Sequence, residues 1–367
     1  MTGVPAAPAI ATIDGLRLHL QAAINVELST IPPYLYALYS IVDPASDAAK
    51  LIRSVVVEEM LHATLMANVL LGVGGTPRFY DRATVPTYPG PWPHRVPELM
   101  LRLRRCSTEH ATQTFLEIER PIDVPPTDPA VQRGDVFDSQ GHFYRALESA
   151  LVSLDEQGGL FAAPQLDRQL TDPDGYHTVK FDSDATGGLI GVHNLDTALA
   201  AIDIPIHQGE GAVDHEFADT EHIELTHYAK FRRLVDGTAP IGTVFPAVDD
   251  PTRGNMPTEV RPVGEFADAL YCYTMVLLDR LFTTERADDQ RRSTIAAMYG
   301  VMSGMLAPVC RYMMTLPADD HTVWGPAFEF FEYTDPDAPE TELRARASAL
   351  GTTHPRLVPH LRHADRL

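Results

Sequence analysis

Apolar residues recur at three- and four-residue steps along most of the chain, which is the period of an amphipathic helix. Over residues 14–40 the apolar stripe is formed by Leu20, Ile24, Leu28 and Ile31. Pro32 and Pro33 interrupt this stretch. Because proline removes a backbone donor and clashes with the preceding turn, we expect the helix to kink or divide near Leu28 and Ser29.

The same period predicts five further helices in the first two thirds of the chain, over residues 46–71, 98–120, 142–156, 194–208 and 214–235. Six prolines between residues 75 and 97 predict a long irregular loop. The segment YHTVKFD at 176–182 has weak strand character. The expected fold class is therefore all-α, with long loops.

A Pro- and Gly-rich stretch, DGTAPIGTVFPAVDDPTRGNMP, predicts a boundary after residue 236. We expect residues 1–236 to form a metal-binding helical bundle and residues 237–367 to form a C-terminal helical subdomain packed on it. Apolar runs at 265–282 and 292–316 predict two helices in that subdomain.

Composition narrows the classes of function. With 29 basic and 50 acidic residues the formal net charge is −21, which disfavours nucleic acid and anionic membranes as partners and favours small molecules and cations. The three cysteines lack paired spacing, so neither a disulfide framework nor a thiolate zinc site is expected. The N-terminus has no signal-peptide pattern, and we expect no membrane span and a cytoplasmic location.

Candidate chemistry appears as a Glu-x-x-His pattern that occurs twice. Glu59 and His62 fall within the apolar stripe of one predicted helix, and Glu224 and His227 within that of another. A buried carboxylate needs a partner, a proton or a metal, because isolated burial costs several kcal/mol. One such motif is a weak signal, but two copies in phase with the apolar stripe indicate a two-metal carboxylate site.

Helical phase adds further carboxylates to this site. Glu27 interrupts the apolar stripe of the first helix and lies 32 residues before Glu59, which fits two antiparallel helices joined by a short turn. The fourth carboxylate has two candidates. Glu119 is on the apolar side of its predicted helix, unlike Glu117, whereas Glu210 lies between glycines that would permit local unwinding.

These residues stand in an ordered series of motifs: VELSTIPPYLYALYSI, VVEEMLHATLMANVLLGVGGTP, FLEIERP, HQGEG, ELTHYAKF and TLPADDHTVWGPAFEFF. The series, spanning about residues 14–335, resembles the ferritin-like family of the iminophenylpyruvate and indole imine dimer synthases of violacein- and rebeccamycin-type pathways. The resemblance implies a ferritin-like four-helix bundle in a stand-alone member of that family. It implies metal ligands at Glu27, Glu59, His62, Glu119, Glu224 and His227, with Glu210 competing for one position.

The hypothesis that follows is a non-haem di-iron oxidase or oxygenase that uses dioxygen on a small, amino-acid-derived substrate of specialised metabolism. Two irons per chain are expected, manganese being the alternative metal. Three other functions stay open: oxidative imine coupling, with haem as a less favoured cofactor; iron storage or ferroxidase activity; and a metal-free structural module. Assembly into a homo-oligomer is compatible with each of them.

Overall fold

The computed structural model describes residues 10–93, 98–121, 139–171, 174, 188–209, 225–283 and 288–367. Several sequence predictions lie outside these residues: the strand character at 176–182, residues 214–224 of the helix predicted over 214–235, Glu210 and Glu224. Among the described residues the chain is predominantly helical, and the strands are limited to one short pair. The predicted all-α class is confirmed.

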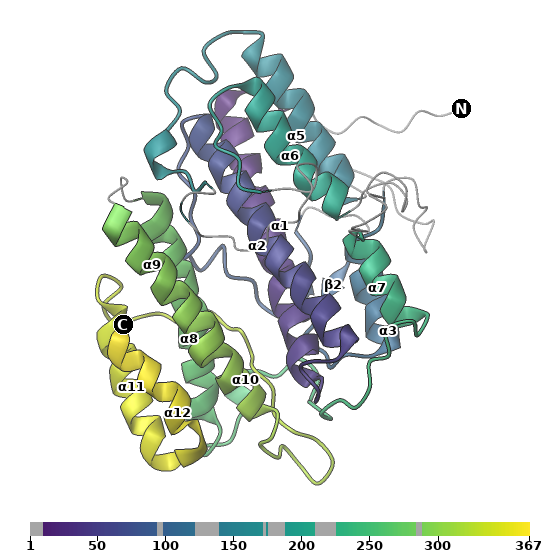
Figure 1. The fold of residues 1–367 in the computed structure, drawn as a ribbon, viewed down its shortest axis with the longest axis vertical. Coiled ribbons are helices and arrows are strands. Elements are labelled where there is room, and N and C mark those ends of the chain that lie inside the picture. The colour runs from purple at the N-terminus through teal and green to yellow at the C-terminus, as the bar shows by residue number, and fades with distance from the viewer. Residues whose placement is uncertain are drawn as a thin grey trace.

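Two long helices, α1 (Ile13–Ser40) and α2 (Asp47–Gly72), run side by side through the centre of the molecule (Figure 1). The side chains of Thr12 and Ser46 cap their first turns by accepting hydrogen bonds from the backbone N–H groups of Gly15 and Ala49. A short turn joins the two helices. Their mid-points, which carry Glu27 and Glu59, therefore lie at the same depth.

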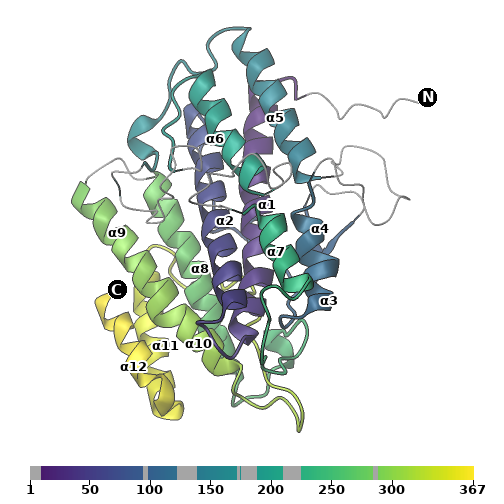
Figure 2. The ribbon, with the colours of Figure 1, turned by 45° about the vertical axis from the view of Figure 1, so that its right-hand side comes forward.

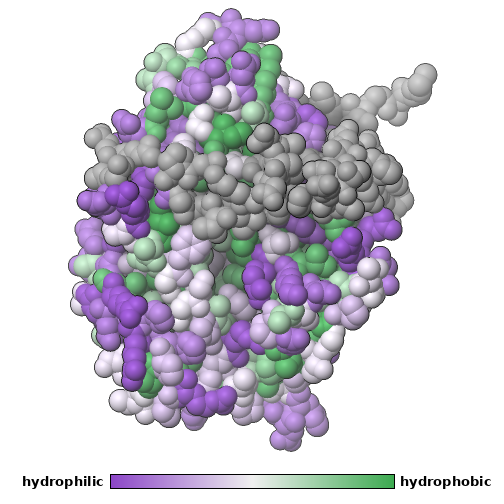
Figure 3. Space-filling view, viewed as in Figure 1, coloured by the Kyte–Doolittle hydropathy of each residue, from purple (hydrophilic) through white to green (hydrophobic). Residues whose placement is uncertain are grey.

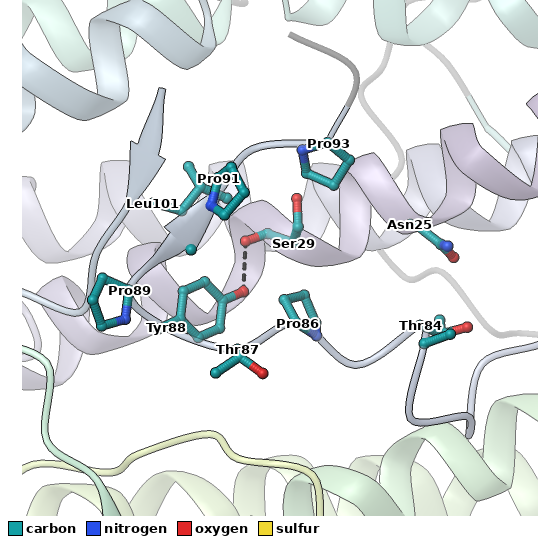
Figure 4. A pocket seen from close by; sticks show the side chains of 12 residues that line it. Asn25, Ser29, Thr84, Pro86, Thr87, Tyr88, Pro89, Pro91, Pro93 and Leu101 are labelled. Atoms are coloured by element: carbon teal, nitrogen blue, oxygen red, sulfur yellow. Dashed lines mark hydrogen bonds between the residues drawn. The ribbon is translucent and has the colours of Figure 1, made fainter. Parts of the chain in front are cut away.

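The helix α1 passes through Pro32 and Pro33 without dividing, so of the kink or division predicted near Leu28 and Ser29, the division does not occur. Pro33 has no N–H to donate to the carbonyl oxygen of Ser29, one turn earlier. The hydroxyl of Tyr88 donates a hydrogen bond of 2.7 Å to that oxygen instead (Figure 4). Tyr88 belongs to the proline-rich loop, which borders a hollow of about 470 Å³ beside α1.

The other two positions of the bundle are each filled by shorter helices (Figure 2). One position holds α5 (Gln140–Asp155) and, below it, α3 (Thr108–His110), a π-helical turn η1 (Ala111–Phe115) and α4 (Leu116–Ile118). The other holds α6 (Leu195–Gln208) and α7 (His227–Val235). α5 contacts α1 and α6, whereas α2 contacts both α6 and α7. The bundle thus has two continuous positions and two broken ones.

The helix predicted over residues 98–120 begins only at Thr108, where Ser107 is the N-cap. The preceding chain is extended: β2 (Met100–Leu101) pairs antiparallel with β1 (Gly90–Pro91). Burial alternates there, since Leu101 and Leu103 are buried while Met100 and Arg102 are more exposed. This two-residue period is that of a strand, and the sequence analysis overlooked it.

Of the helix predicted over residues 214–235, the structure describes only the part from residue 225 onward, and there α7 begins at His227. Thr226 is the N-cap of α7, and its side chain accepts a hydrogen bond of 3.2 Å from the N–H of Ala229. His227 is therefore in the first turn of α7. The imidazole lies at the beginning of this helix.

The C-terminal region adds a group of helices on one side of α1 and α2 (Figure 1). Its first members are α8 (Arg261–Thr283), α9 (Asp288–Val301), the π-helical turn η5 (Met302–Leu306) and α10 (Ala307–Met313). α8 matches the helix predicted over residues 265–282, and α9, η5 and α10 together match the helix predicted over residues 292–316. The sequence analysis missed α11 (Pro339–Thr353) and α12 (Val358–Leu361). Short 3₁₀ turns complete the described structure: η2 (Leu166–Arg168), η4 (Arg253–Asn255), η6 (Pro355–Leu357) and η7 (Arg362–Arg366).

Two helical stretches are long and apolar enough to cross a membrane, Asp47–Gly72 and Asp289–Met313, although no span was predicted. In the first, 89% of the apolar window is buried inside the protein. That helix is α2, the core helix that carries Glu59 and His62. Around α9 to α12 the surface in Figure 3 mixes hydrophilic and hydrophobic residues. Length and composition are therefore weak indications of a membrane span here.

Candidate metal centre

The candidate centre lies where the broken positions of the bundle face the middle of α1 and α2. Glu119 follows the end of α4, and His227 begins α7. From the long helices come Glu27, Glu59 and His62. All five side chains are buried, with at most 2% of each residue exposed. Four different elements therefore bring carboxylates and imidazoles to one buried place.

Glu27, Glu59 and His62 form a first group that could hold a metal ion, with one donor atom from each lying within 4.8 Å of the others. The Nδ1 atom of His62 lies 3.6 Å from Oε2 of Glu27. The other oxygen of Glu27 accepts hydrogen bonds from Gln140 Nε2, at 2.6 Å, and from the Tyr144 hydroxyl. The start of α5 thus holds Glu27 in place and leaves Oε2 directed at His62.

Glu59, Glu119 and His227 form a second group with the same spacing. The Nδ1 atom of His227 lies 3.0 Å from Oε1 of Glu59 and 3.3 Å from Oε2 of Glu119. The remaining oxygen of Glu119 accepts a 2.5 Å hydrogen bond from the Tyr34 hydroxyl, and that of Glu59 accepts one of 3.1 Å from Thr30. Because Glu59 belongs to both groups, the two groups are adjacent.

Both imidazoles present Nδ1 to the centre, because their Nε2 atoms are held from behind. Nε2 of His62 lies 2.8 Å from the amide oxygen of Gln208, the last residue of α6, and Nε2 of His227 lies 2.8 Å from Oε2 of Glu58. Each of these oxygens accepts a hydrogen bond, so each Nε2 carries the proton. In the neutral imidazole Nδ1 then carries the lone pair that could bind a metal ion, as it does in metal-binding histidines with a fixed tautomer.

Behind His227, Glu58 also forms a buried ion pair with Lys230. The ammonium of Lys230, one turn along α7, donates to both oxygens of Glu58, at 2.5 and 2.7 Å. Lys230 and Glu58 are 6% and 1% exposed. Burial raises the pKa of Glu58, but the charge of Lys230 and the contacts with His227 outweigh it and lower the pKa to about 2. Glu58 is therefore an ionised acceptor that orients His227.

The carboxylates strongly influence one another's ionisation. Burial together with the charges of Glu27 and Glu119 raises the pKa of Glu59 well above its ordinary value. Burial lowers the pKa of His227, but Glu119, Glu58 and Glu59 outweigh it and hold that pKa well above its usual range. Of the four buried carboxylates here, only Glu58 contacts a buried ammonium among the described residues, that of Lys230. The centre consequently favours added positive charge.

The donor set fits a pair of metal ions. Oε2 of Glu27 is buried without a hydrogen-bond donor among the described residues. Nδ1 of His227 faces two carboxylate oxygens, and the raised pKa of His227 places a proton between these atoms; a metal ion would take the place of that proton. A metal ion satisfies such acceptors, and mixed carboxylate and imidazole ligation suits iron or manganese.

One side of the centre is closed by aromatic rings. Tyr34, Phe115 and Phe231 pack against one another with ring centroids 4.8–5.0 Å apart, and all three are fully buried. Phe115 ends the π-helical turn η1, and Phe231 lies on α7. This cluster excludes water from the side of Glu119.

A comparison with protein-family models finds a match to the ferritin-like family over residues 20–236. The chain belongs to the ferritin-like family. The matched residues contain the five clustered side chains and both broken positions of the bundle.

Two curated relatives of this ferritin-like chain are each 24% identical to it. One is a 2-imino-3-(indol-3-yl)propanoate dimerase from Chromobacterium violaceum, with 86% of this chain and 34% of the relative aligned. The other is a dichlorochromopyrrolate synthase from Lentzea aerocolonigenes, with 94% of this chain and 38% of the relative aligned. The chain thus spans little more than a third of the length of these relatives.

Among solved structures, a ferritin-like protein from Caulobacter vibrioides matches with a TM-score of 0.60 and 24% identity. The match covers 87% of this chain and 100% of that one. It supports the ferritin-like fold alone. The likeness extends beyond the 20–236 range of the family model, because it covers a larger share of the chain.

Of the residues predicted for the centre of this ferritin-like protein, Glu27, Glu59, His62, Glu119 and His227 come together. Glu210 and Glu224 lie outside the described residues. Glu117 forms a contact of 3.5 Å with Arg120 and is absent from both groups, in agreement with the preference for Glu119. Gly209 packs tightly here, since an added Cβ would lie 3.4 Å from Oε2 of Glu119.

Sequence reasoning missed the partners of these residues. Glu58 was not among the residues predicted for the centre, and the structure shows it behind His227, where it holds Nε2. Glu58 lies one turn before His62, so helical phase contained the signal for its burial. Lys230 lies one turn after Thr226 and His227 on α7, so helical phase contained the signal for its burial as well. Gln140, Tyr144 and Gln208 lie at or near helix ends, and no local pattern indicates that these ends meet the centre.

Proposed function

We propose that this ferritin-like protein is a non-haem di-iron oxidase or oxygenase that acts on a small, amino-acid-derived molecule with dioxygen. The observation that carries this proposal is the position of Glu59, which belongs to both donor groups. Glu59 would be shared by two metals, Glu27 and His62 would hold one, and Glu119 and His227 would hold the other. Two bound irons supply electrons to dioxygen.

The residues around the centre have separate tasks in this proposal. Tyr34 fixes one oxygen of Glu119, and Gln140 and Tyr144 together fix one oxygen of Glu27. The other oxygen of each carboxylate is left for a metal. Gln208 and Glu58 fix the imidazoles. The aromatic cluster keeps water out. The protein thereby supplies orientation and a dry site, while the metals supply the redox chemistry.

A second candidate is oxidative coupling of two imine-bearing 2-oxo acid derivatives. The names of the relatives from Chromobacterium violaceum and Lentzea aerocolonigenes favour it. Incubation of the protein with the imine of indole-3-pyruvate, followed by mass spectrometry, tests this activity. A dimeric product that requires the protein would support coupling, and an oxygenated monomer would support the first candidate.

Metal analysis of protein purified without chelator tests the proposed centre. We expect about two irons per chain, as in di-iron carboxylate bundles, and no Soret band. A Soret band would favour haem, and protein free of metal would favour a structural module. Uptake of hundreds of irons per assembly from iron and dioxygen would favour storage.

Replacing Glu59 and His62 together by alanine should abolish iron binding, because both donor groups lose a ligand. The matched control replaces Glu332 and His321 by alanine, which removes the same residue types from exposed positions. Stoichiometric iron in the Glu59→Ala/His62→Ala protein would show that the centre lies elsewhere.

A further inference from the structure

A second interior feature lies between the bundle and the C-terminal helices. It is a cavity of about 390 Å³ enclosed by α1, α2, α8, α9 and η5, the elements that lie together in Figure 1. The walls are largely apolar. Four lining residues are only half-buried although they lie between packed helices: Leu35, Val57, Met60 and Met302. The space is therefore accessible to solvent.

The cavity is separate from the candidate metal centre. On α1 it is lined by Leu28, Ile31 and Leu35, each one residue after Glu27, Thr30 and Tyr34 of the centre. One residue corresponds to a rotation of roughly 100° about a helix axis. On α2, Met60 and Ala63 follow Glu59 and His62 in the same way. The two sites therefore use different faces of the same two helices.

The walls of the cavity are adaptable. Met60, Met275, Met298 and Met302 all line it. Methionine side chains are unbranched and polarisable, and they adjust to ligands of different shape. The size and the mainly apolar lining with a few polar groups are those of small-molecule sites.

Two buried tyrosines supply polar groups. Tyr39 and Tyr271 line the cavity and are 6% and 2% exposed. Among the described residues neither hydroxyl has a hydrogen-bond partner, and neither oxygen is fully buried, so each is accessible. An accessible tyrosine hydroxyl can donate a hydrogen bond to a polar atom of a ligand or accept one from it.

The cavity has one charged lining residue, Arg53, which is exposed at its rim. One guanidinium nitrogen donates to the carbonyl oxygen of Pro44 at 3.0 Å, which anchors the side chain and leaves other N–H groups for a ligand. Arg53 and Tyr39 line the same cavity. Burial raises the pKa of Tyr39, and the positive charges of Arg311 and Arg53 oppose that shift.

We propose that this cavity binds an amphipathic carboxylate: the apolar body among the methionines and leucines, and the carboxylate at Arg53 and Tyr39. A guanidinium pairs well with a carboxylate, and Arg53 meets no competing lining charge. The shared chemistry is an apolar body with one carboxylate, either an aliphatic chain or an aryl group. The proposal is independent of the reaction at the metal centre.

Titration calorimetry of the full chain with octanoate and with 3-phenylpropanoate tests this binding. We expect one site per chain for at least one of them, and the tighter binder identifies the aliphatic or aryl class. Octan-1-ol provides the apolar chain without the charge. Arg53→Gln should weaken carboxylate binding about tenfold, the size of a charge-assisted hydrogen bond, and leave octan-1-ol unchanged.

Two further variants separate binding in the cavity from binding elsewhere. Lys50→Gln removes a charge from an exposed lysine one turn away on the same helix and should leave the affinity unchanged. Met275→Trp should fill the cavity and abolish binding. Ala307→Leu, at a half-buried wall position, is a milder filling variant in case Met275→Trp does not fold.

Absence of binding for both carboxylates would overturn the proposal. So would an unchanged carboxylate affinity in Arg53→Gln, or unchanged binding in a folded filling variant. Iron content is measured in parallel, because the cavity proposal expects normal iron in all these variants. A metal-free protein that binds octanoate would contradict the proposed function and leave the cavity site intact.

Discussion

At the residue scale, the centre is defined by acceptors that face one another. His227 has its Nδ1 close to Glu59 and Glu119, while Nε2 is fixed by Glu58. The Lys230–Glu58 pair supports this orientation from behind, and it is buried. A buried pair of this kind contributes little net stability, but removal of one partner leaves an uncompensated charge. Lys230 is therefore expected to position His227 through Glu58.

Replacing Lys230 by methionine tests this role. The variant leaves the Glu58 carboxylate buried without its ammonium, so we expect a loss of about 3–5 kcal/mol in the free energy of unfolding. Iron affinity should fall by roughly 10- to 100-fold, because supporting partners of metal-bound imidazoles have effects of this size. Urea unfolding and competition with an iron chelator measure the two quantities.

The control for Lys230→Met is Lys50→Met, which alters a lysine whose side chain is 62% exposed. Lys50→Met should leave both quantities near those of the unchanged protein. Lys230→Arg keeps the positive charge and should recover part of the iron affinity. Wild-type iron affinity in a folded Lys230→Met protein would contradict the positioning role.

At the element scale, the centre depends on helices that begin or end beside it. The ends of α4 and α6 and the beginnings of α5 and α7 each bring a side chain to the same buried place. Continuous helices would present only residues spaced by one turn. The proline pair in α1 is the opposite case, because the helix continues and another segment satisfies the freed carbonyl of Ser29.

Replacing Tyr88 by phenylalanine removes the donor to Ser29 and leaves a buried carbonyl oxygen unsatisfied. We expect a loss of about 1–3 kcal/mol in the free energy of unfolding, measured with urea. Tyr271→Phe is the matched control, since the Tyr271 hydroxyl has no partner among the described residues. Equal effects of the two substitutions would show that the contact with Ser29 is unimportant.

At the scale of the whole molecule, α1 and α2 are shared by two parts of the chain. The half-helices of the bundle pack on one side, and α8 to α10 pack on the other (Figure 2). Asp279 of α8 accepts hydrogen bonds from the backbone N–H groups of Phe79 and Tyr80, at 2.8 and 3.0 Å. These contacts join the C-terminal helices to the loop that follows α2.

We expect the two parts to unfold as one unit, because they share a core and because Asp279 links them. Asp279→Ala leaves two backbone N–H groups without their acceptor and should lower the free energy of unfolding by about 2–4 kcal/mol. Calorimetry and urea titration measure this change. Asp289→Ala, at an aspartate with a fully exposed side chain, is the control.

Two separate thermal transitions, only one of which shifts in Asp279→Ala, would contradict this expectation of cooperative unfolding. They would instead support independent units at the sequence-predicted boundary after residue 236. A single transition that shifts as a whole would show that the C-terminal region is part of the same folding unit.

The sequence by itself determined the helical class and indicated most of the candidate donor residues that the structure brings together. Both follow from local periodicity: Glu27, Glu59 and His62 interrupt apolar stripes, and an inward position on a helix is fixed by residues within two turns. The alternation of buried and exposed residues around Leu101 was also a local signal. It indicated that the helix predicted over residues 98–120 begins later than its first residue.

Tertiary structure alone decided which helices stop, which nitrogen of each histidine faces the centre, and which residues hold the donors. The contacts from Tyr34 to Glu119 and from Lys230 to Glu58 join residues 85 and 172 positions apart. No periodic pattern encodes such pairs, because they depend on how separate helices pack. The cavity at Arg53 arises for the same reason, from a space that five packed elements leave between them.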